Sequence, residues 1–284
     1  MSRIVYLNGE YMAPEQAKIS IFDRSVLFGD AVYEVTGVLG GRLVDFEHHM
    51  ARLKSSLGKL SIPPPIDREG ILAAFRELVR RNGIMEGLVY VQITRGRQER
   101  DFVYGTDLQP AVFMFTQVTG SSTSPYLESG VSLKSAPDIR WARRDIKTVN
   151  LLGQVLAKHA AHESGAYEAL MVDPNGHVTE CGATSFFIFR DKTIITRPLS
   201  NDILPGVTRR AVVALCERDQ IGLEERSFTL EEAYAAEEAF ITGASTFVMP
   251  VTRIDGRTIS NGVPGPATMA MRAIYLDYAR ETVT

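Results

Sequence analysis

Cysteine is scarce in this chain of 284 residues. Its two cysteines, Cys181 and Cys216, lie far apart, and neither has a second cysteine at CxxC spacing. A disulfide framework or a cysteine-based zinc site needs more cysteines at closer spacing, so we expect neither. The scarcity favours a reducing, cytoplasmic setting.

Long apolar runs and strong charge of one sign are also missing. The run Ala111–Val118 is among the longest and is far shorter than a membrane span. Met1–Tyr6 lacks the apolar core of a signal peptide and predicts a strand instead. The formal net charge is −3 and no basic block stands out. We therefore expect neither a membrane nor a nucleic acid as a partner.

Several familiar catalytic patterns are absent too. The chain contains no GxGxxG, GxxxxGK[ST], HExxH or GxSxG, so the sites that these patterns build are not predicted. His159 and His162 are three positions apart on one predicted helix, but no third ligand is evident. We therefore predict no metal site.

The residues that are present predict an α+β fold. Hydrophobic residues make up 45% of the chain, enough for one large domain or two ordinary ones. Turn signals at Asn8-Gly9 and Gly40-Gly41 predict two hairpins. Asp45 and Asp67 are predicted N-caps of two helices whose apolar residues recur three and four positions apart. Two further strands, 88–94 and 111–119, complete a predicted sheet with both helices on one side.

The small polar residues 120–125 are the predicted linker between an N-terminal domain, 1–119, and a C-terminal domain, 126–284. The elements predicted beyond the linker are helices over about 150–165, 206–222 and 266–280, and hairpins around 174–176, 191–192 and 251–259. Many short strands with hairpin turns argue against a doubly wound parallel sheet.

Lys147 is the principal catalytic candidate. It ends the basic run Ile139–Lys147, and the apolar stretch Thr148–Leu152 follows. Desolvation and neighbouring arginines both disfavour an ammonium ion, so such a lysine can serve as the nucleophile of a Schiff base. From this run alone, a surface lysine in a basic stretch is the alternative.

Four other clusters carry possible site chemistry. Leu204–Arg210 predicts a loop that leads into a helix, where unpaired N–H groups can bind a phosphate. Glu180, at a strand end, can hold a pyridine nitrogen protonated. Ile241–Thr246 can add phosphate donors, and Arg100 in a charged loop can bind a carboxylate. The alternatives are an ordinary helix start for Leu204–Arg210, a solvated turn residue for Glu180 and a solvated charged loop for Arg100.

Together, the order and spacing of these clusters resemble the fold-type IV pyridoxal-phosphate (PLP) enzymes, and most closely the D-amino-acid transaminases. The resemblance covers nearly the whole chain. The matching stretches are Ser20–Arg24, Phe28–Val35, His49–Leu53, Asp138–Leu152, Val178–Glu180 and Asn201–Arg209. It implies an α+β enzyme with a small α/β sandwich domain and a larger β-barrel-like domain with flanking helices.

The resemblance also implies a role for each matching residue. Lys147 is expected to carry the internal aldimine and to move the proton between Cα and C4′, and Glu180 to pair with the pyridine nitrogen. The expected cofactor-binding residues are Arg52, Glu180, Leu204, Val207, Thr208, Ala244 and Ser245. Those expected to approach the substrate are Tyr33, Val35 and Arg100. The family completes this site with a partner subunit, so a homodimer is expected.

The chain departs from the pattern at three positions. In D-amino-acid transaminases the carboxylate-binding arginine is typically followed two residues later by histidine, whereas Phe102 stands here. Ser185 stands where asparagine is common, and Ala244 lacks a hydroxyl that is often present. Since phenylalanine cannot donate a hydrogen bond, the first departure bears on the substrate class.

The leading prediction is a PLP-dependent transaminase that moves an amino group from a D-amino acid, such as D-alanine, to a 2-oxo acid. An (R)-selective amine transaminase is the closest rival, favoured by Phe102. A branched-chain L-amino-acid aminotransferase, a PLP lyase of the aminodeoxychorismate type (hinted at by Glu180-Cys181) and a cofactor-free binding protein are the remaining alternatives.

Overall fold

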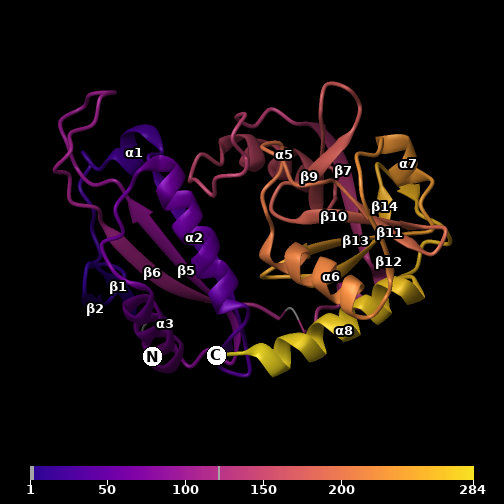
Figure 1. The fold of residues 1–284 in the computed structure, drawn as a ribbon, viewed down its shortest axis with the longest axis horizontal. Helices are drawn as coiled ribbons and strands as arrows, with labels where there is room; N and C mark the ends of the chain where they lie inside the picture. The colour runs from indigo at the N-terminus through magenta and orange to yellow at the C-terminus, as the bar shows by residue number, and fades with distance from the viewer. Residues whose placement is uncertain (1–2, 121) are drawn as a thin grey trace. The chain divides into compact units, whose positions relative to one another are not determined.

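A computed structural model describes residues 3–120 and 122–284 (Figure 1). The chain divides into two compact units. The first comprises the described part of Met1–Gly120 with Ile146–Asn150 and Thr282–Thr284, and the second comprises the described part of Ser121–Asp145 with Leu151–Glu281. The domain bounds 1–119 and 126–284, and the linker 120–125, stay a prediction.

The first unit is built on a six-stranded sheet in which every neighbouring pair is antiparallel, in the order β2-β1-β6-β5-β3-β4. Its strands are β1 (Val5–Leu7), β2 (Glu10–Met12), β3 (Ala31–Leu39), β4 (Arg42–Leu43), β5 (Glu86–Thr94) and β6 (Val112–Val118). Asn8 and Gly9 connect β1 to β2 with φ of 48° and 102°, the region that a type I′ turn requires. Both predicted hairpins are confirmed.

Helices α2 (Phe46–Leu60) and α3 (Arg68–Asn82) bury their apolar stripes against this sheet, as predicted. The Asp67 side chain accepts from the Gly70 N–H at 2.8 Å, which confirms that N-cap. The predicted N-cap at Asp45 is wrong. Its backbone is left-handed, with φ of 53°, and its side chain makes no cap hydrogen bond, whereas a capping side chain needs an extended backbone to reach the first turn.

Strand β3 presents alternate residues to the two faces of the sheet. Val32 belongs to the core beneath the helices, and Glu34 bonds to side chains of α2. Tyr33 lies on the other face, where its ring stacks on Tyr90 with 5.4 Å between centroids. Val35 is on the Tyr33 face by the same alternation, so this face carries both predicted substrate residues of β3.

The second unit is built on a mixed nine-stranded sheet in the order β12-β11-β10-β13-β14-β7-β8-β9, with β15 paired to β14. Its strands are β7 (Val131–Pro137), β8 (Glu168–Val172), β9 (Val178–Cys181), β10 (Ser185–Arg190), β11 (Thr193–Thr196), β12 (Gly222–Glu225), β13 (Glu238–Gly243), β14 (Phe247–Ile254) and β15 (Arg257–Thr258). The three hairpins predicted in this part, β8–β9, β10–β11 and β14–β15, are confirmed.

Three predicted helices of this unit are present as α5 (Leu152–Glu163), α6 (Val207–Arg218) and α8 (Pro266–Thr282). Helix α6 ends at Arg218, before the predicted end near Gly222, and β12 begins at Gly222. Three short helices escaped prediction: α1 (Arg24–Phe28), α4 (Tyr126–Ser129) and α7 (Leu230–Tyr234). They are too short to show an apolar period. Among the described residues, none of the helices has the length and apolarity to cross a bilayer.

Candidate active site

Lys147 lies on a short segment that pairs with strand β3. The Tyr33 N–H donates to the Lys147 carbonyl at 3.0 Å, and Val32 forms an isolated β-bridge with Thr148. The Lys147 N–H donates in turn to Ser56 Oγ of α2 at 3.2 Å. Lys147 Nζ lies 4.3 Å from the centroid of the Tyr33 ring. The structure therefore brings together the predicted nucleophile and a predicted substrate residue.

A buried charge cluster lies on the opposite, helix-covered face of β3. Arg52 donates from Nε and Nη2 to the two carboxylate oxygens of Glu34, at 2.7 and 2.8 Å. His49 Nδ1 lies 2.9 Å from Glu34 Oε2. Burial acts to raise the pKa of Glu34, but Arg52 and His49 outweigh it and bring that pKa down to about 2. Arg52, the predicted phosphate ligand, is thus held in a fork by Glu34.

Burial lowers the pKa of His49 despite the nearby Glu34 carboxylate. The imidazole is therefore neutral at neutral pH. Its hydrogen bond to Glu34 then requires the proton on Nδ1. The cluster contains one carboxylate and one guanidinium, so its formal charges cancel.

Arg100, the third predicted substrate residue, lies on an exposed loop after β5. The backbone of this loop is anchored by Arg24, which is only 4% exposed and donates to the carbonyls of Asp101 at 2.6 Å and Phe102 at 3.2 Å. Arg24 Nε and Arg95 Nε both donate to Asp30 Oδ2, at 2.9 and 2.7 Å. The loop is ordered by contacts within its own unit.

Glu180 lies on β9 of the second unit, where it is 5% exposed. Its Oε1 accepts from Arg140 Nη1 at 2.5 Å and from the Leu204 N–H at 3.0 Å. Oε2 receives no hydrogen bond from any residue in the described ranges. Burial raises the pKa of Glu180, while Arg140 and the Leu204 N–H oppose that rise. One carboxylate oxygen is therefore held and the other is available to a donor.

A second carboxylate fixes the Arg140 side chain. Arg140 donates from Nε and Nη2 to the two oxygens of Asp138, at 2.9 and 2.7 Å, which leaves Nη1 for Glu180. Thr179 Oγ1 also donates to Asp138, at 2.7 Å. A register shift between β8 and β9 occurs at this point, and such a bulge can turn the consecutive Thr179 and Glu180 side chains toward one cluster.

The N-terminus of α6 packs closely against the start of β10. The N-cap residue Gly206 has no side chain, so it offers no cap acceptor to the N–H groups of Val207 and Thr208. A Cβ added at Gly206 would lie 2.7 Å from Ser185 Oγ. Ser185 is paired with Thr242 across β10 and β13, which places the end of β13 near this helix.

Two buried hydroxyls near the end of β13 lack a partner among the described residues. They belong to Thr242 and Thr246. Ala244 and Ser245, both predicted phosphate ligands, form the turn between β13 and β14. A buried hydroxyl without a partner is costly unless a ligand or water completes it. This end of the second unit therefore offers both helix N–H groups and hydroxyl donors.

The comparisons with known proteins agree with this chemistry. The family described as Amino-transferase class IV matches residues 31–254. The chain belongs to this family. A D-alanine aminotransferase from Bacillus licheniformis is 38% identical over 264 residues, which cover 93% of each chain. A D-alanine aminotransferase from Staphylococcus epidermidis is 35% identical over 277 residues, which cover 96% of this chain and 97% of that one.

A solved branched-chain aminotransferase from the archaeon Thermoproteus uzoniensis, with norvaline, is similar as well. It has a TM-score of 0.87 and 28% sequence identity, covering 98% of this chain and 95% of that chain. Another solved branched-chain amino acid aminotransferase, described with pyridoxamine 5′-phosphate, has a TM-score of 0.91 and 25% identity and covers 100% of this chain and 98% of that chain. The predicted fold-type IV, α+β class and the predicted enzyme class, a PLP-dependent transaminase, are thereby confirmed.

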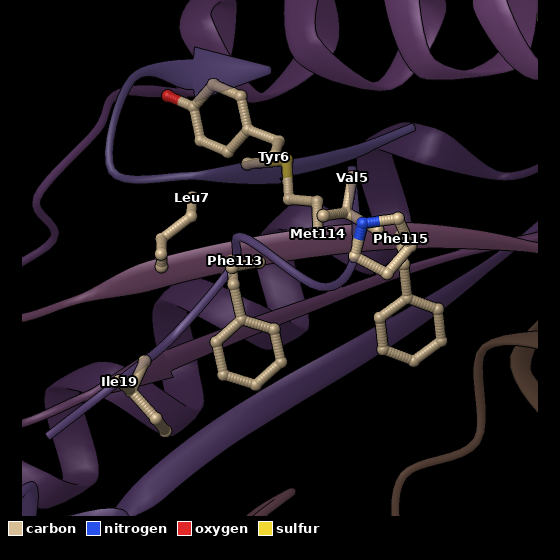
Figure 2. Close-up of a pocket in the computed structure, with 9 residues that line it drawn as sticks. Val5, Tyr6, Leu7, Ile19, Phe113, Met114 and Phe115 are labelled. Carbon is tan, nitrogen blue, oxygen red and sulfur yellow. The ribbon is translucent and has the colours of Figure 1, made fainter. Parts of the chain in front are cut away.

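Two pockets within single units of this aminotransferase take no part in the predicted site. One, of about 210 Å³, lies along β1 and β6, and Figure 2 shows Phe113 and Phe115 side by side in its wall. Its lining is mainly apolar and includes Leu7 and Ile19. The other, of about 680 Å³, lies in the second unit and includes His162. Neither lining contains a predicted site residue.

Sequence reasoning missed the charged residues that support the predicted ones. Arg140 and Asp138 lie within a matching stretch, and Arg24 and Asp30 lie in two others, yet none was given a role. The signal was present: buried arginines need acceptors, so charged residues within otherwise matching stretches are candidates for supporting contacts. The joint arrangement of Lys147 with Glu180 stays a prediction, because the two residues belong to different units.

Proposed function

We propose that this class IV aminotransferase moves an amino group from a D-amino acid such as D-alanine to a 2-oxo acid, with PLP as cofactor and Lys147 as its covalent attachment point. The observation that carries the proposal is the Glu180 carboxylate, which Arg140 and the Leu204 N–H hold by one oxygen. The two D-alanine aminotransferases are similar to this protein over nearly the whole chain. This similarity supports the choice of a D-amino acid as amino donor.

The residues present fit the proposed cofactor. The hydroxyls of Thr242 and Thr246, which have no partner within the described residues, and the start of α6 at Gly206 suit a phosphate. The close approach of Gly206 to Ser185 leaves room for no side chain there. A structural neighbour was solved with pyridoxamine 5′-phosphate. The residues proposed to complete the cofactor site are Arg52, Leu204, Val207, Thr208, Ala244 and Ser245.

When bound, PLP supplies an electron sink for negative charge at the amino acid Cα. Glu180, which pairs with Arg140, would hold a proton on the pyridine nitrogen by a charge-assisted hydrogen bond. Lys147 moves the proton at Cα, and Tyr33 fixes the lysine through a backbone hydrogen bond and a ring contact. Tyr33, Val35 and Arg100 are proposed to orient the substrate, with Arg100 binding its carboxylate.

A homodimer in the cytoplasm is also part of the proposal. Leu152, Val155 and Leu156 on one face of α5 are 70, 55 and 53% exposed, and a partner copy would cover such an apolar patch. A dimeric mass in light scattering supports the dimer. A monomeric mass at the working concentration would contradict the proposed homodimer.

The (R)-amine transaminase is retained as a second candidate on one observation, the exposed apolar Phe102 beside Arg100. A visible absorption spectrum of the purified protein, before and after D-alanine is added without an acceptor, separates the candidates. We expect a yellow protein whose visible band bleaches with release of pyruvate in a single turnover. A yellow protein that D-alanine leaves unchanged but an (R)-amine bleaches would favour the second candidate. A lyase of the aminodeoxychorismate type would instead release pyruvate from aminodeoxychorismate, without any amino acceptor.

A further inference from the structure

Arg100 lies beside two aromatic rings. Its side chain is exposed, and it makes no ion pair or hydrogen bond with any residue within 3–120 or 122–284. Its guanidinium carbon lies 5.6 Å from the centroid of the Phe28 ring and 5.5 Å from that of Phe102. Both distances are within the range of a cation–π contact. The five N–H donors of Arg100 are therefore available to a ligand, and two aromatic rings lie within cation–π distance of its guanidinium.

The two rings form a pair of their own. Their centroids are 5.3 Å apart and their planes meet at 47°. Phe28 is the last residue of α1, which ends at Gly29 with a φ of 67°. The Asp23 side chain caps that helix by accepting from the Ser25 N–H at 2.8 Å. One ring thus comes from a capped helix and the other from the loop that carries Arg100.

The loop holds Phe102 in place through its backbone. The buried Arg24 binds the carbonyls of Asp101 and Phe102. The Val103 N–H donates to Asp101 Oδ1 at 3.0 Å, and Gln98 Nε2 donates to the Val103 carbonyl at 2.8 Å. These contacts close the loop without using the Phe102 side chain, which is 75% exposed. The ring is thus not needed to fold the loop, although it contacts both Phe28 and Arg100.

We propose that Phe102, together with Phe28, is a positioning residue that orients the Arg100 guanidinium for the carboxylate of the substrate. The proposal rests on the proposed function and adds a specificity determinant to it. A guanidinium lying against two rings keeps its in-plane donors free for the two oxygens of a carboxylate. The phenylalanine at this position then supports binding of amino acids and 2-oxo acids, instead of admitting an amine that lacks a carboxylate.

The test uses the PLP-loaded enzyme and propionate, which has a carboxylate but no amino group to react. The dissociation constant is measured by titration calorimetry, with propionamide as the uncharged ligand of the same shape. The variants are Phe102→Leu, which removes the ring, Phe102→Tyr, which keeps it, and Arg100→Gln. Val103→Ala is the matched control, because Val103 is also 75% exposed and is the next residue in the loop.

We expect Phe102→Leu to weaken propionate binding about 2- to 5-fold, the loss of one exposed cation–π contact, while Phe102→Tyr and Val103→Ala bind like the wild type. Arg100→Gln should weaken binding about 10-fold or more, and propionamide should bind weakly to every form. The KM for D-alanine should rise in Phe102→Leu by the same factor as the propionate constant, with kcat unchanged.

Equal propionate binding by wild type and Phe102→Leu would overturn the proposal, as would equal losses in the leucine and tyrosine variants. Wild-type binding by Arg100→Gln would overturn it too. Failure of the proposed function looks different: the wild type would then not release pyruvate from D-alanine, whereas the ranking of the variants toward propionate would still be measured.

Discussion

Lys147 Nζ lies 4.3 Å from the centroid of the Tyr33 ring, and the Tyr33 N–H donates to the Lys147 carbonyl at 3.0 Å. The two contacts fix both the backbone and the amine of the lysine against strand β3. Tyr33 in turn stacks on Tyr90 of the next strand. A lysine that must act on Cα gains from such restriction, since less side-chain freedom is lost when the substrate arrives.

Replacement of this lysine tests its role directly. Lys147→Ala should lose all measurable transfer from D-alanine while keeping its circular dichroism spectrum, because the half-buried side chain contributes little to the core. Lys54→Ala, an exposed position on α2, is the control and should keep full activity. Comparable transfer rates in Lys147→Ala and the wild type would show that Lys147 is not the catalytic amine.

Removal of Arg140 should make the reaction sensitive to acid. Burial already raises the pKa of Glu180, and Arg140 is the main opposing influence. Without it the pKa rises further, so the ionised carboxylate is lost at a higher pH as the pH falls. In Arg140→Gln we expect the acid limb of the half-reaction profile to move toward neutral pH, with a rate at pH 7 lower by about 10-fold or more.

The profile is measured by stopped-flow absorbance between about pH 5 and pH 9, since the pKa of an essential group shows directly in the rate. Arg143→Gln serves as the control, because its side chain is 45% exposed and pairs with Asp145, not with Glu180. Superimposable profiles for Arg140→Gln and wild type would mean that Arg140 does not keep Glu180 ionised.

Glu34→Gln should destabilise the protein at neutral pH by about 3 kcal/mol, because it removes the fully buried carboxylate that pairs with the mostly buried Arg52. The folded pKa of Glu34 is about 2, below the ordinary value near 4.3 of an unfolded chain. Its stabilisation is therefore complete above about pH 4.3 and is lost as the pH falls toward 2. The free energies of unfolding of variant and wild type should converge over that interval.

Urea unfolding at a series of pH values measures this difference. The control is Glu77→Gln, whose carboxylate pairs with Arg80 and Arg81 at the helix surface and should matter little. A gap between Glu34→Gln and wild type that stays constant down to pH 2 would contradict the assignment.

Thr242→Val separates stability from cofactor binding. The buried Thr242 hydroxyl has no partner among the described residues, so its removal should stabilise the PLP-free protein by about 1 kcal/mol. If the hydroxyl binds the phosphate, the same change should weaken PLP affinity about 10-fold. Denaturant unfolding and a fluorescence titration with PLP give the two values.

Thr36→Val is the matched control for this change. The Thr36 hydroxyl is also buried and without a described partner, but it lies on β3 of the first unit. We expect the same gain in stability with no change in PLP affinity. Equal effects of the two substitutions on PLP binding would exclude a specific phosphate contact by Thr242.

Local patterns predicted much of the fold because their causes are local. Asn8-Gly9 selects a hairpin by its left-handed backbone, and Asp67 caps α3 through a hydrogen bond three residues away. Asp45 has the same residue type before a helix, yet its conformation is set by the turn from β4 into α2. Residue type alone therefore predicted one cap correctly and one wrongly.

The kinds of side chain that the proposed chemistry needs were evident from the sequence: a lysine, a glutamate, a helix start with glycine and threonine, and arginines. Their supporting contacts depend on tertiary structure, because charged partners such as Arg140 and Glu180, or Glu34 and Arg52, lie on different elements. The fork of Asp138 on Arg140 and the ring contact of Phe102 with Arg100 differ from these, because each joins residues only two positions apart. Burial and direction decide what a charged group does, and both arise only when distant segments pack together.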